Sequence, residues 1–168
     1  MPITYVTGDA TRPQTDEPAI IAHICNDVGA WGKGFVLALS QQWPSSQRQY
    51  RTWAQDPHPA REPFELGRTQ FVPVQSQPTI WVANMIAQHG FYAQHGIPPI
   101  RYHALTACLT QVATFANTHH ASVHLPRIGC GLAGGKWEYI EFEIIRTLSD
   151  KTISVTVYDF QASPGPQL

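Results

Sequence analysis

The sequence carries little charge, and the charge that it has is nearly balanced. Charged side chains make up 14% of its 168 residues, and the formal net charge is −1 with histidine counted as neutral. Nucleic acids and anionic membranes attract proteins that present a concentrated basic field, so this balance argues against either as a general partner. Any anion that the protein binds is therefore expected to be held by local geometry rather than by bulk charge.

Long apolar runs and paired cysteines are also lacking. No apolar run approaches the ~20 residues of a membrane span, and the N-terminal residues MPITYVTGDA lack the basic and apolar regions of a signal peptide. The three cysteines, Cys25, Cys108 and Cys130, are too widely spaced for a C-x-x-C metal clip or a disulfide framework. These observations predict a reduced, cytoplasmic protein with no membrane segment.

Hydrophobic residues are plentiful by comparison, and their spacing alternates between strand-like and helix-like segments. They account for 43% of the chain, which is enough for one globular domain with a buried core. Strands are predicted at 3–6, 18–25, 69–74, 79–86, 121–126 and 152–160, and helices at 32–44, 45–56, 101–119 and 136–150. This alternation predicts an α/β fold whose parallel or mixed sheet is covered by helices on both faces, followed by a flexible tail at 161–168.

Two glycine-rich segments each follow a buried strand and precede a helix. They are NDVGAWGKGF at 26–35 and LPRIGCGLAGG at 125–135. Glycine lacks a Cβ atom, so backbone N–H groups can converge on an anion, and the following helix adds the positive end of its dipole. Either segment alone could be an ordinary tight turn. Together they predict a pair of clamps around a diphosphate.

The second segment also contains a dinucleotide-like pattern, which its surroundings do not support. Gly129, Gly131 and Gly134 spell G-x-G-x-x-G. A dinucleotide-binding fold needs an acidic residue ~20 positions later at the end of the next strand. The nearest match, Asp159, lies at the end of the last predicted strand, where no second half of such a fold can follow. The first segment lacks the spacing of a phosphate-binding P-loop. A nicotinamide-dependent oxidoreductase is therefore disfavoured.

Four segments together carry a family resemblance. TYVTGDAT, HICNDVGAWGKGF, LPRIGCGLAGGKW and ISVTVYDF occur in this order over nearly the whole chain. In this combination the sequence resembles the macrodomain family. Within the family it is similar to the branch that includes terminal ADP-ribose protein glycohydrolase, the antitoxin macrodomains and the yeast ADP-ribose-1″-phosphate phosphatase. The resemblance implies a single macrodomain over residues 1–160, a three-layer α/β/α sandwich with a mixed, largely parallel sheet, and ADP-ribose as the ligand.

The resemblance also implies which residues bind ADP-ribose. The carboxylate of Asp9 would accept the adenine amino group, and segments 29–35 and 128–133 would cover the two sides of the diphosphate and distal ribose. Tyr158 and Phe160 would line the adenine or the proximal ribose. The implied ligand-binding residues are Gly8, Asp9, Ala10, Asn26, Gly29, Trp31, Gly32, Lys33, Gly34, Phe35, Ile128, Gly129, Cys130, Gly131, Leu132, Ala133, Tyr158 and Phe160.

Three of these residues have equally plain structural alternatives. Trp31 would pack over the ligand or make an ordinary loop contact. Lys33 would screen phosphate charge or be a solvated lysine before a helix. Cys130 would have its pKa lowered by a helix N-terminus, or be a small side chain that suits a tight loop, which is the favoured reading.

The chain departs from the terminal glycohydrolase at two positions where the resemblance places catalytic residues. Ala133 stands where that enzyme has an aspartate, and Gln88 and His89 stand in place of the lysine that forms a covalent adduct with the sugar. The lysine-adduct route is therefore not expected here. His89, like His95 in the same predicted loop, would lie near the distal ribose or be an exposed loop histidine.

His23 matches a histidine that contributes to catalysis in the yeast phosphatase. An imidazole beside the distal ribose could accept a proton from water or stabilise a leaving phosphate. The alternative is a core histidine with a satisfied hydrogen bond. With Asn26 expected to point at the distal ribose, the candidate catalytic residues are His23, Asn26, Gln88 and His89. The histidines do not have metal-ligand spacing, so neither a metal nor another cofactor is expected.

The sequence thus predicts an ADP-ribose-binding macrodomain that hydrolyses ADP-ribose derivatives at C1″ of the distal ribose. Candidate substrates are glutamate- or aspartate-linked ADP-ribose on proteins and ADP-ribose-1″-phosphate. The alternative is a reader module that binds ADP-ribose without catalysis, which the missing lysine and aspartate favour. The expected partner is ADP-ribose or an ADP-ribosylated protein, with neither a membrane nor a nucleic acid expected.

Overall fold

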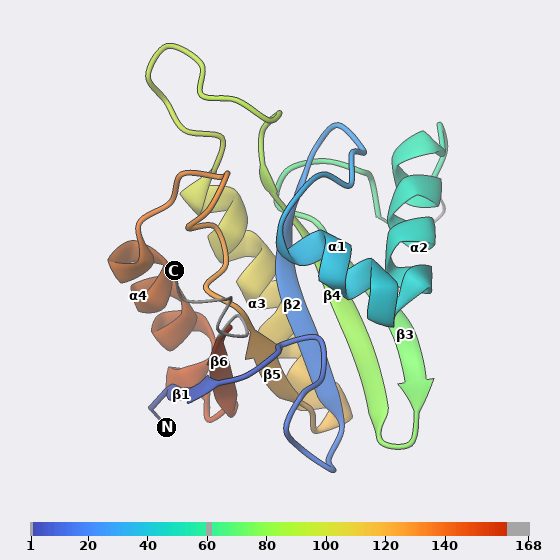
Figure 1. Ribbon diagram of the computed structural model, residues 1–168, viewed down its shortest axis with the longest axis vertical. Helices are drawn as coiled ribbons and strands as arrows, with labels where there is room; N and C mark the ends of the chain where they lie inside the picture. Colours follow the sequence, from blue (N-terminus) through green and yellow to red (C-terminus); the bar gives the residue numbers. More distant parts are fainter. Residues whose placement is uncertain (1, 60–61, 161–168) are drawn as a thin grey trace, which may run out of the picture.

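One mixed sheet organises the molecule, in the strand order β1-β6-β5-β2-β4-β3 (Figure 1). The structure is a computed structural model that describes residues 2–59 and 62–160. Its strands are β1 (Thr4–Thr7), β2 (Ala19–Asn26), β3 (Thr69–Ser76), β4 (Thr79–Gln88), β5 (Ser122–Leu125) and β6 (Val155–Asp159). Its helices are α1 (Phe35–Gln42), α2 (Pro44–Gln55), α3 (Tyr102–His119), α4 (Trp137–Thr147) and the short 3₁₀ helix η1 (Ser149–Lys151).

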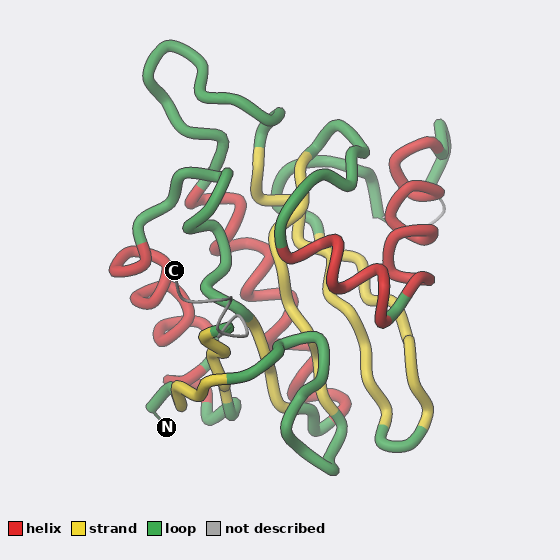
Figure 2. The backbone as a smooth tube through the Cα atoms, viewed as in Figure 1, coloured by secondary structure: helices red, strands yellow, loops and turns green. Residues whose placement is uncertain are grey.

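All neighbouring strands pair in parallel except β3, which forms an antiparallel hairpin with β4. The central strands β2 and β4 are buried along most of their length, as expected for apolar strands that are covered on both faces. Alternate residues of β2 serve two cores: Ile20 and Ala22 pack with α3 and α4, whereas Ala19 and Ile21 pack with α1 and α2. The predicted three-layer α/β/α sandwich with a mixed, largely parallel sheet is confirmed (Figure 2).

Some element boundaries differ from the prediction. The second helix was predicted to begin at residue 45, but α2 begins at Pro44, with no side-chain cap. Proline suits the first position of a helix because the N–H that it lacks has no partner there anyway. The last strand begins at Val155 rather than at 152, because η1 and the left-handed Thr152 precede it. The tail predicted at 161–168 lies outside the described residues.

The chain changes direction across the sheet between β2 and β5. After β2 it enters α1, which packs on one face, and after β5 it enters α4, which packs on the other. The two connecting loops therefore leave the shared carboxyl edge toward opposite faces, which is the position where α/β folds commonly bind ligands. No helix within the described residues is long and apolar enough to cross a membrane.

Candidate functional site

The predicted site residues come from five parallel strands and follow one another along one edge of the sheet. Asp9 follows β1, Phe160 follows β6, segment 128–133 follows β5, segment 29–35 follows β2, and His89 follows β4. Neighbouring strands lie about 4.8 Å apart, so the row of strand ends spans roughly 19 Å. Residues distant in the sequence are thus arranged as one linear series.

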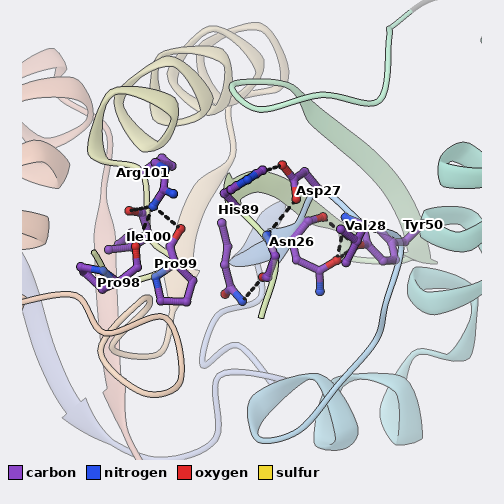
Figure 3. Close-up of polar contacts among 11 residues, drawn as sticks. Asn26, Asp27, Val28, Tyr50, His89, Pro98, Pro99, Ile100 and Arg101 are labelled. Carbon is purple, nitrogen blue, oxygen red and sulfur yellow. Dashed lines mark hydrogen bonds and ion pairs between the residues drawn. The ribbon is translucent and has the colours of Figure 1, made fainter. Parts of the chain in front are cut away.

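Asn26 holds the first glycine loop in shape. Its side-chain Nδ2 donates to the Ala30 carbonyl oxygen at 2.7 Å, and its Oδ1 accepts the N–H groups of Val28 and Ala30, each at 3.1 Å (Figure 3). The Tyr50 hydroxyl lies 2.7 Å from the Asn26 carbonyl oxygen and 2.9 Å from Oδ1. We expected Asn26 to point at the distal ribose. In the structure its amide is instead hydrogen-bonded within the loop.

The glycines of the first loop have different roles. Gly29 and Gly34 have positive φ angles of 79° and 82°, which favour glycine. A Cβ atom on Gly29 would lie 2.8 Å from Cβ of Ala54, whereas one on Gly32 would meet nothing within 4 Å. Gly34 precedes α1 without a side-chain hydrogen bond to cap that helix. The first turn of α1 can therefore offer backbone N–H groups to an anion, beside the open space at Gly32.

The second glycine loop shows the same division. Gly129 and Gly134 have positive φ angles of 73° and 74°. A Cβ on Gly129 would lie 2.8 Å from Cδ1 of Ile100, and one on Gly134 would lie 2.8 Å from Cβ of Pro98. Gly131 has no such constraint, and its Cβ would meet nothing within 4 Å. Packing and backbone conformation explain Gly129 and Gly134, the first and last glycines of the G-x-G-x-x-G pattern. The space next to the middle glycine, Gly131, is open.

Asp9, which follows the edge strand β1 at one end of the row of strand ends, keeps one carboxylate oxygen available. Its Oδ1 accepts the backbone N–H of Thr11 at 2.9 Å and the Thr11 hydroxyl at 2.7 Å. Its Oδ2 bonds to none of the described residues and can accept a hydrogen bond from a ligand. Phe160 is exposed nearby, at the end of β6, but Tyr158 is buried. Tyr158 therefore supports the Gly8 turn from below rather than lining the surface, contrary to our expectation.

His23 and Trp31 lie in the interior beneath the first glycine loop. The Trp31 ring packs at 5.4 Å from the His23 ring, and its Nε1 donates to the Val36 carbonyl oxygen at 2.9 Å. His23 is only 2% exposed, and its Nε2 donates to Oδ1 of Asn84 at 2.5 Å. Burial lowers the pKa of His23 to about 4, so the imidazole is neutral. Trp31 does not cover the surface, and His23 has the contacts of a satisfied core histidine.

The amide of Asn84 fixes the proton position on His23. Asn84 Nδ2 donates to the Ser46 carbonyl oxygen at 3.2 Å and to Oε1 of Gln70 at 3.0 Å. Its Oδ1 must therefore face the imidazole, and because this oxygen can only accept, His23 carries its proton on Nε2. The polar groups of this buried cluster thus satisfy one another.

A carboxylate–imidazole pair that the sequence reasoning missed lies on the rim of the site. Asp27 Oδ2 is 2.6 Å from Nδ1 of His89, and its Oδ1 accepts the N–H of Gly90 at 2.9 Å (Figure 3). The His89 side chain is 46% exposed, against 16% for Asp27. Asp27 fixes the orientation of the imidazole through Nδ1, and no described residue bonds to Nε2. The available signal was an aspartate directly after a buried strand.

Some of the remaining candidate residues are exposed on the surface of the loops, and the others pack beneath them. Gln88 donates from Nε2 to the Gly90 carbonyl oxygen at 2.9 Å, so its amide helps to shape the loop after β4. Burial raises the pKa of the Cys130 thiol, opposite to the lowering considered from the sequence, which favours a packing role. Lys33 and Leu132 are exposed. Phe35, Ile128, Ala133 and Ala10 are buried or half-buried beneath the surface.

A cavity of about 470 Å³ lies elsewhere, at the amino ends of β5 and β6, and none of the candidate residues lines it. One of its lining side chains, His124, is buried and bonds to Tyr158 Oη through Nδ1 at 2.8 Å and to Ser122 Oγ through Nε2 at 2.7 Å. Burial lowers the pKa of His124 to about 4. Within residues 2–59 and 62–160, no three His, Cys, Asp or Glu side chains are grouped to hold a metal ion.

Comparison with known proteins identifies the family. No protein-family model matches the chain. A solved structure of a macrodomain protein from Streptomyces coelicolor is 50% identical, with a TM-score of 0.79 over 94% of this chain and 98% of that chain. The chain belongs to the macrodomain family. A solved structure of DarTG from Thermosipho africanus in complex with ADP-ribose shares the fold of this macrodomain at 16% identity, with a TM-score of 0.65 over 86% of this chain and 39% of that chain.

Two curated relatives place the macrodomain among proteins of different size. The chain is 34% identical over 166 residues to chromodomain-helicase-DNA-binding protein 1-like from Danio rerio, covering 95% of this chain but only 16% of that much longer protein. It is 26% identical over 162 residues to the ADP-ribose 1″-phosphate phosphatase of Scheffersomyces stipitis, covering 83% of this chain and 91% of the relative. The macrodomain is therefore related both to a module within a longer protein and to a stand-alone phosphatase.

Proposed function

We propose that residues 1–160 form a single macrodomain that binds ADP-ribose along the carboxyl edge of the sheet and hydrolyses a bond at C1″ of the distal ribose. The order of the candidate residues along that edge carries the proposal. It runs from Asp9 through the two glycine loops to His89. The parts of ADP-ribose follow the same order, from the adenine through the diphosphate to the distal ribose. The relationship to an ADP-ribose 1″-phosphate phosphatase supports the same ligand class.

Each part of the ligand then meets a group suited to it. Asp9 Oδ2 accepts a hydrogen bond from the adenine amino group. The diphosphate is proposed to lie between Gly32 and Gly131, where a Cβ atom would meet nothing within 4 Å, near the uncapped N-terminus of α1. This arrangement would hold the anion by backbone geometry, as expected from the chain's near-zero net charge. Fixing the diphosphate and adenine would position C1″ for reaction, a contribution that can reach several kcal/mol.

His89 is suited to proton transfer at the distal ribose. For a carboxylate ester at C1″, a water oxygen forms the new bond to C1″ while His89 Nε2 accepts a proton from that water. The C1″–O bond breaks, and the leaving group departs as a carboxylate, so the products are ADP-ribose and the restored acidic side chain. Asp27, 2.6 Å from His89 Nδ1, stabilises the imidazolium formed in this step. The imidazolium then returns its proton to solvent.

A reader without catalysis is the second candidate, and Ala133 favours it. This position carries no carboxylate, and the nearby Gln88 amide is engaged with the Gly90 carbonyl oxygen. Phosphorus NMR of the protein mixed with ADP-ribose-1″-phosphate separates the alternatives. Shifted diphosphate signals with a growing inorganic phosphate peak indicate hydrolysis. Shifted signals without product, together with no release of ADP-ribose from a glutamate-modified protein, identify a reader.

The binding mode is tested at Gly131, where a side chain would enter space that the free protein leaves open. Because Gly131 has no positive φ and no atom near its Cβ position, Gly131→Val should fold normally. It should weaken ADP-ribose binding roughly 10- to 100-fold, since it displaces a charged group from its hydrogen bonds. Isothermal titration calorimetry measures the effect, and thermal unfolding confirms that the variant is folded.

Gly131→Ala serves as the graded control, because its smaller side chain should cost less affinity than valine does. Unchanged affinity in Gly131→Val would mean that the second glycine loop does not contact the ligand. Failure of the unaltered protein to bind ADP-ribose at millimolar concentration would overturn the proposed function as a whole.

A further inference from the structure

A hairpin with a defined backbone rises from the carboxyl edge next to His89. The 90–99 hairpin, residues 90–99, starts from an antiparallel bridge between Gln88 and Ile100 and ends in a second bridge between Gln94 and Ile97 (Figure 1, the yellow-green loop above α3). His95 and Gly96 at its tip have φ angles of 54° and 77°, as in tight two-residue hairpin turns. The sequence predicted only an irregular loop here.

The base of the 90–99 hairpin is fixed to the rest of the site. Arg101 Nη1 donates to the carbonyl oxygens of Pro98 at 2.6 Å and Pro99 at 3.1 Å, and the His89 N–H donates to the Pro99 carbonyl oxygen at 2.9 Å (Figure 3). The Ile100 N–H donates to the Ala133 carbonyl oxygen at 3.0 Å, which joins the hairpin to the second glycine loop. These hydrogen bonds connect the hairpin directly to the candidate site.

This hairpin exposes large apolar side chains that have no place in the core. Phe91 is 44% exposed, Tyr92 79% and Ile97 56%, while Leu132 on the adjoining glycine loop is 68% exposed. Exposed apolar groups that gather at one place on a surface typically mark an interaction site. Aromatic residues of this kind are enriched where proteins bind one another.

The absence of charged side chains from this segment indicates which kind of partner it can bind. Residues 87–100 contain no lysine, arginine, aspartate or glutamate. A nucleic-acid partner would require basic side chains to neutralise its phosphates, and a strongly charged peptide would gain no ion pair here. An apolar polypeptide segment gains the burial of the exposed aromatic and aliphatic groups. The hairpin directly follows His89, so a group attached to the distal ribose would lie directly beside it.

We propose that the 90–99 hairpin is the docking surface for the polypeptide that carries the ADP-ribose, and that it binds apolar residues flanking the modified side chain. This inference rests on the proposed function. The glycine loops hold the ADP-ribose, which is the same on every acceptor, and the hairpin selects among acceptors by their neighbouring residues.

The test compares two synthetic peptides that carry ADP-ribose through an amide linkage and differ only in their flanking residues, leucine and phenylalanine in one and serine in the other. With the unaltered protein, calorimetry should show about tenfold tighter binding of the apolar peptide than of free ADP-ribose, and no such gain for the serine peptide. Tyr92→Ser should remove this gain and leave the affinity for free ADP-ribose unchanged.

Tyr139→Ser on α4 is the matched control, because it removes another exposed tyrosine, one that lies outside the site. It should preserve the preference for the apolar peptide. Equal affinities of the two peptides for the unaltered protein would overturn the inference, as would a preference that survives in Tyr92→Ser. Tighter binding of an ADP-ribosylated oligonucleotide than of the apolar peptide would assign the surface to nucleic acid instead. Failure of free ADP-ribose to bind would overturn the proposed function itself, which is a distinct outcome.

Discussion

Two histidines at neighbouring strands of the sheet have opposite surroundings. His23 on β2 is buried, donates to Asn84 and packs against the Trp31 ring. His89, directly after β4, is half-exposed, and it pairs with the Asp27 carboxylate while no described residue bonds to its second nitrogen. Both were candidates for catalysis on sequence grounds. The comparison teaches that a histidine whose partners are all internal contributes to the fold, whereas one with a single charged partner and a free nitrogen can exchange protons with a ligand.

The largest expected effect comes from replacing His89, the exposed histidine of the two. His89→Asn should lower the hydrolysis rate by roughly 100-fold or more, since it removes the group that accepts the proton. Single-turnover kinetics with ADP-ribose-1″-phosphate and with a glutamate-modified protein measure the change. The affinity for ADP-ribose and the unfolding temperature should be unaltered.

Two variants make the His89 result specific. His95→Asn changes an exposed histidine on the 90–99 hairpin that has no role in the proposed reaction, so its rate should be normal. Asp27→Asn should lower kcat about tenfold with little change in KM, because an uncharged amide stabilises the imidazolium less than a carboxylate does. Full activity in His89→Asn would assign the chemistry to other residues.

The next largest effect is expected from replacing His23, the buried histidine, and it concerns stability. His23→Ala should lower the free energy of unfolding by about 2–4 kcal/mol, because it leaves a cavity and an unpaired Asn84 oxygen. Urea denaturation measures the loss. Turnover per folded molecule should stay near that of the unaltered protein. A large loss of kcat in a variant that is fully folded would show that His23 takes part in the reaction, as the resemblance to the phosphatase first indicated.

A smaller, graded effect follows from the pKa values of the buried histidines. Burial lowers the pKa of His23 and of His124 to about 4, below the value of about 6.5 expected in the unfolded chain. The unfolded state therefore binds more protons than the native state between these values, and stability falls as the pH drops from about 6.5 to about 4. Each histidine contributes at most about 3 kcal/mol of this loss.

Urea denaturation at pH 7, 5.5 and 4.5 tests this for the unaltered protein and for His23→Ala. The difference in unfolding free energy between the two should shrink as the pH falls, because only the unaltered protein must keep His23 neutral. A difference that does not change with pH would mean that His23 is charged in the native state or stays accessible to protons.

Much of the fold could be predicted because the signals for it are local. The apolar run of β2 and the helical spacing of α3 are properties of consecutive residues, and both elements occur where expected. The 90–99 hairpin was missed because its bridges join residues that show no alternation of apolar and polar side chains. The boundaries of α2 and β6 were displaced because Pro44 and Thr152 act through backbone geometry.

The sequence by itself determined the fold class, the two glycine loops and the family resemblance, because each is written in the spacing of residues along the chain. Only the tertiary structure decided which side chains are exposed at the carboxyl edge of the sheet. It turned Trp31, Tyr158 and His23 inward and engaged Asn26 within its own loop. It also brought Asp27 and His89 from neighbouring strands to 2.6 Å. The physical reason is that burial and hydrogen-bond partners depend on strand neighbours, which are distant in the sequence.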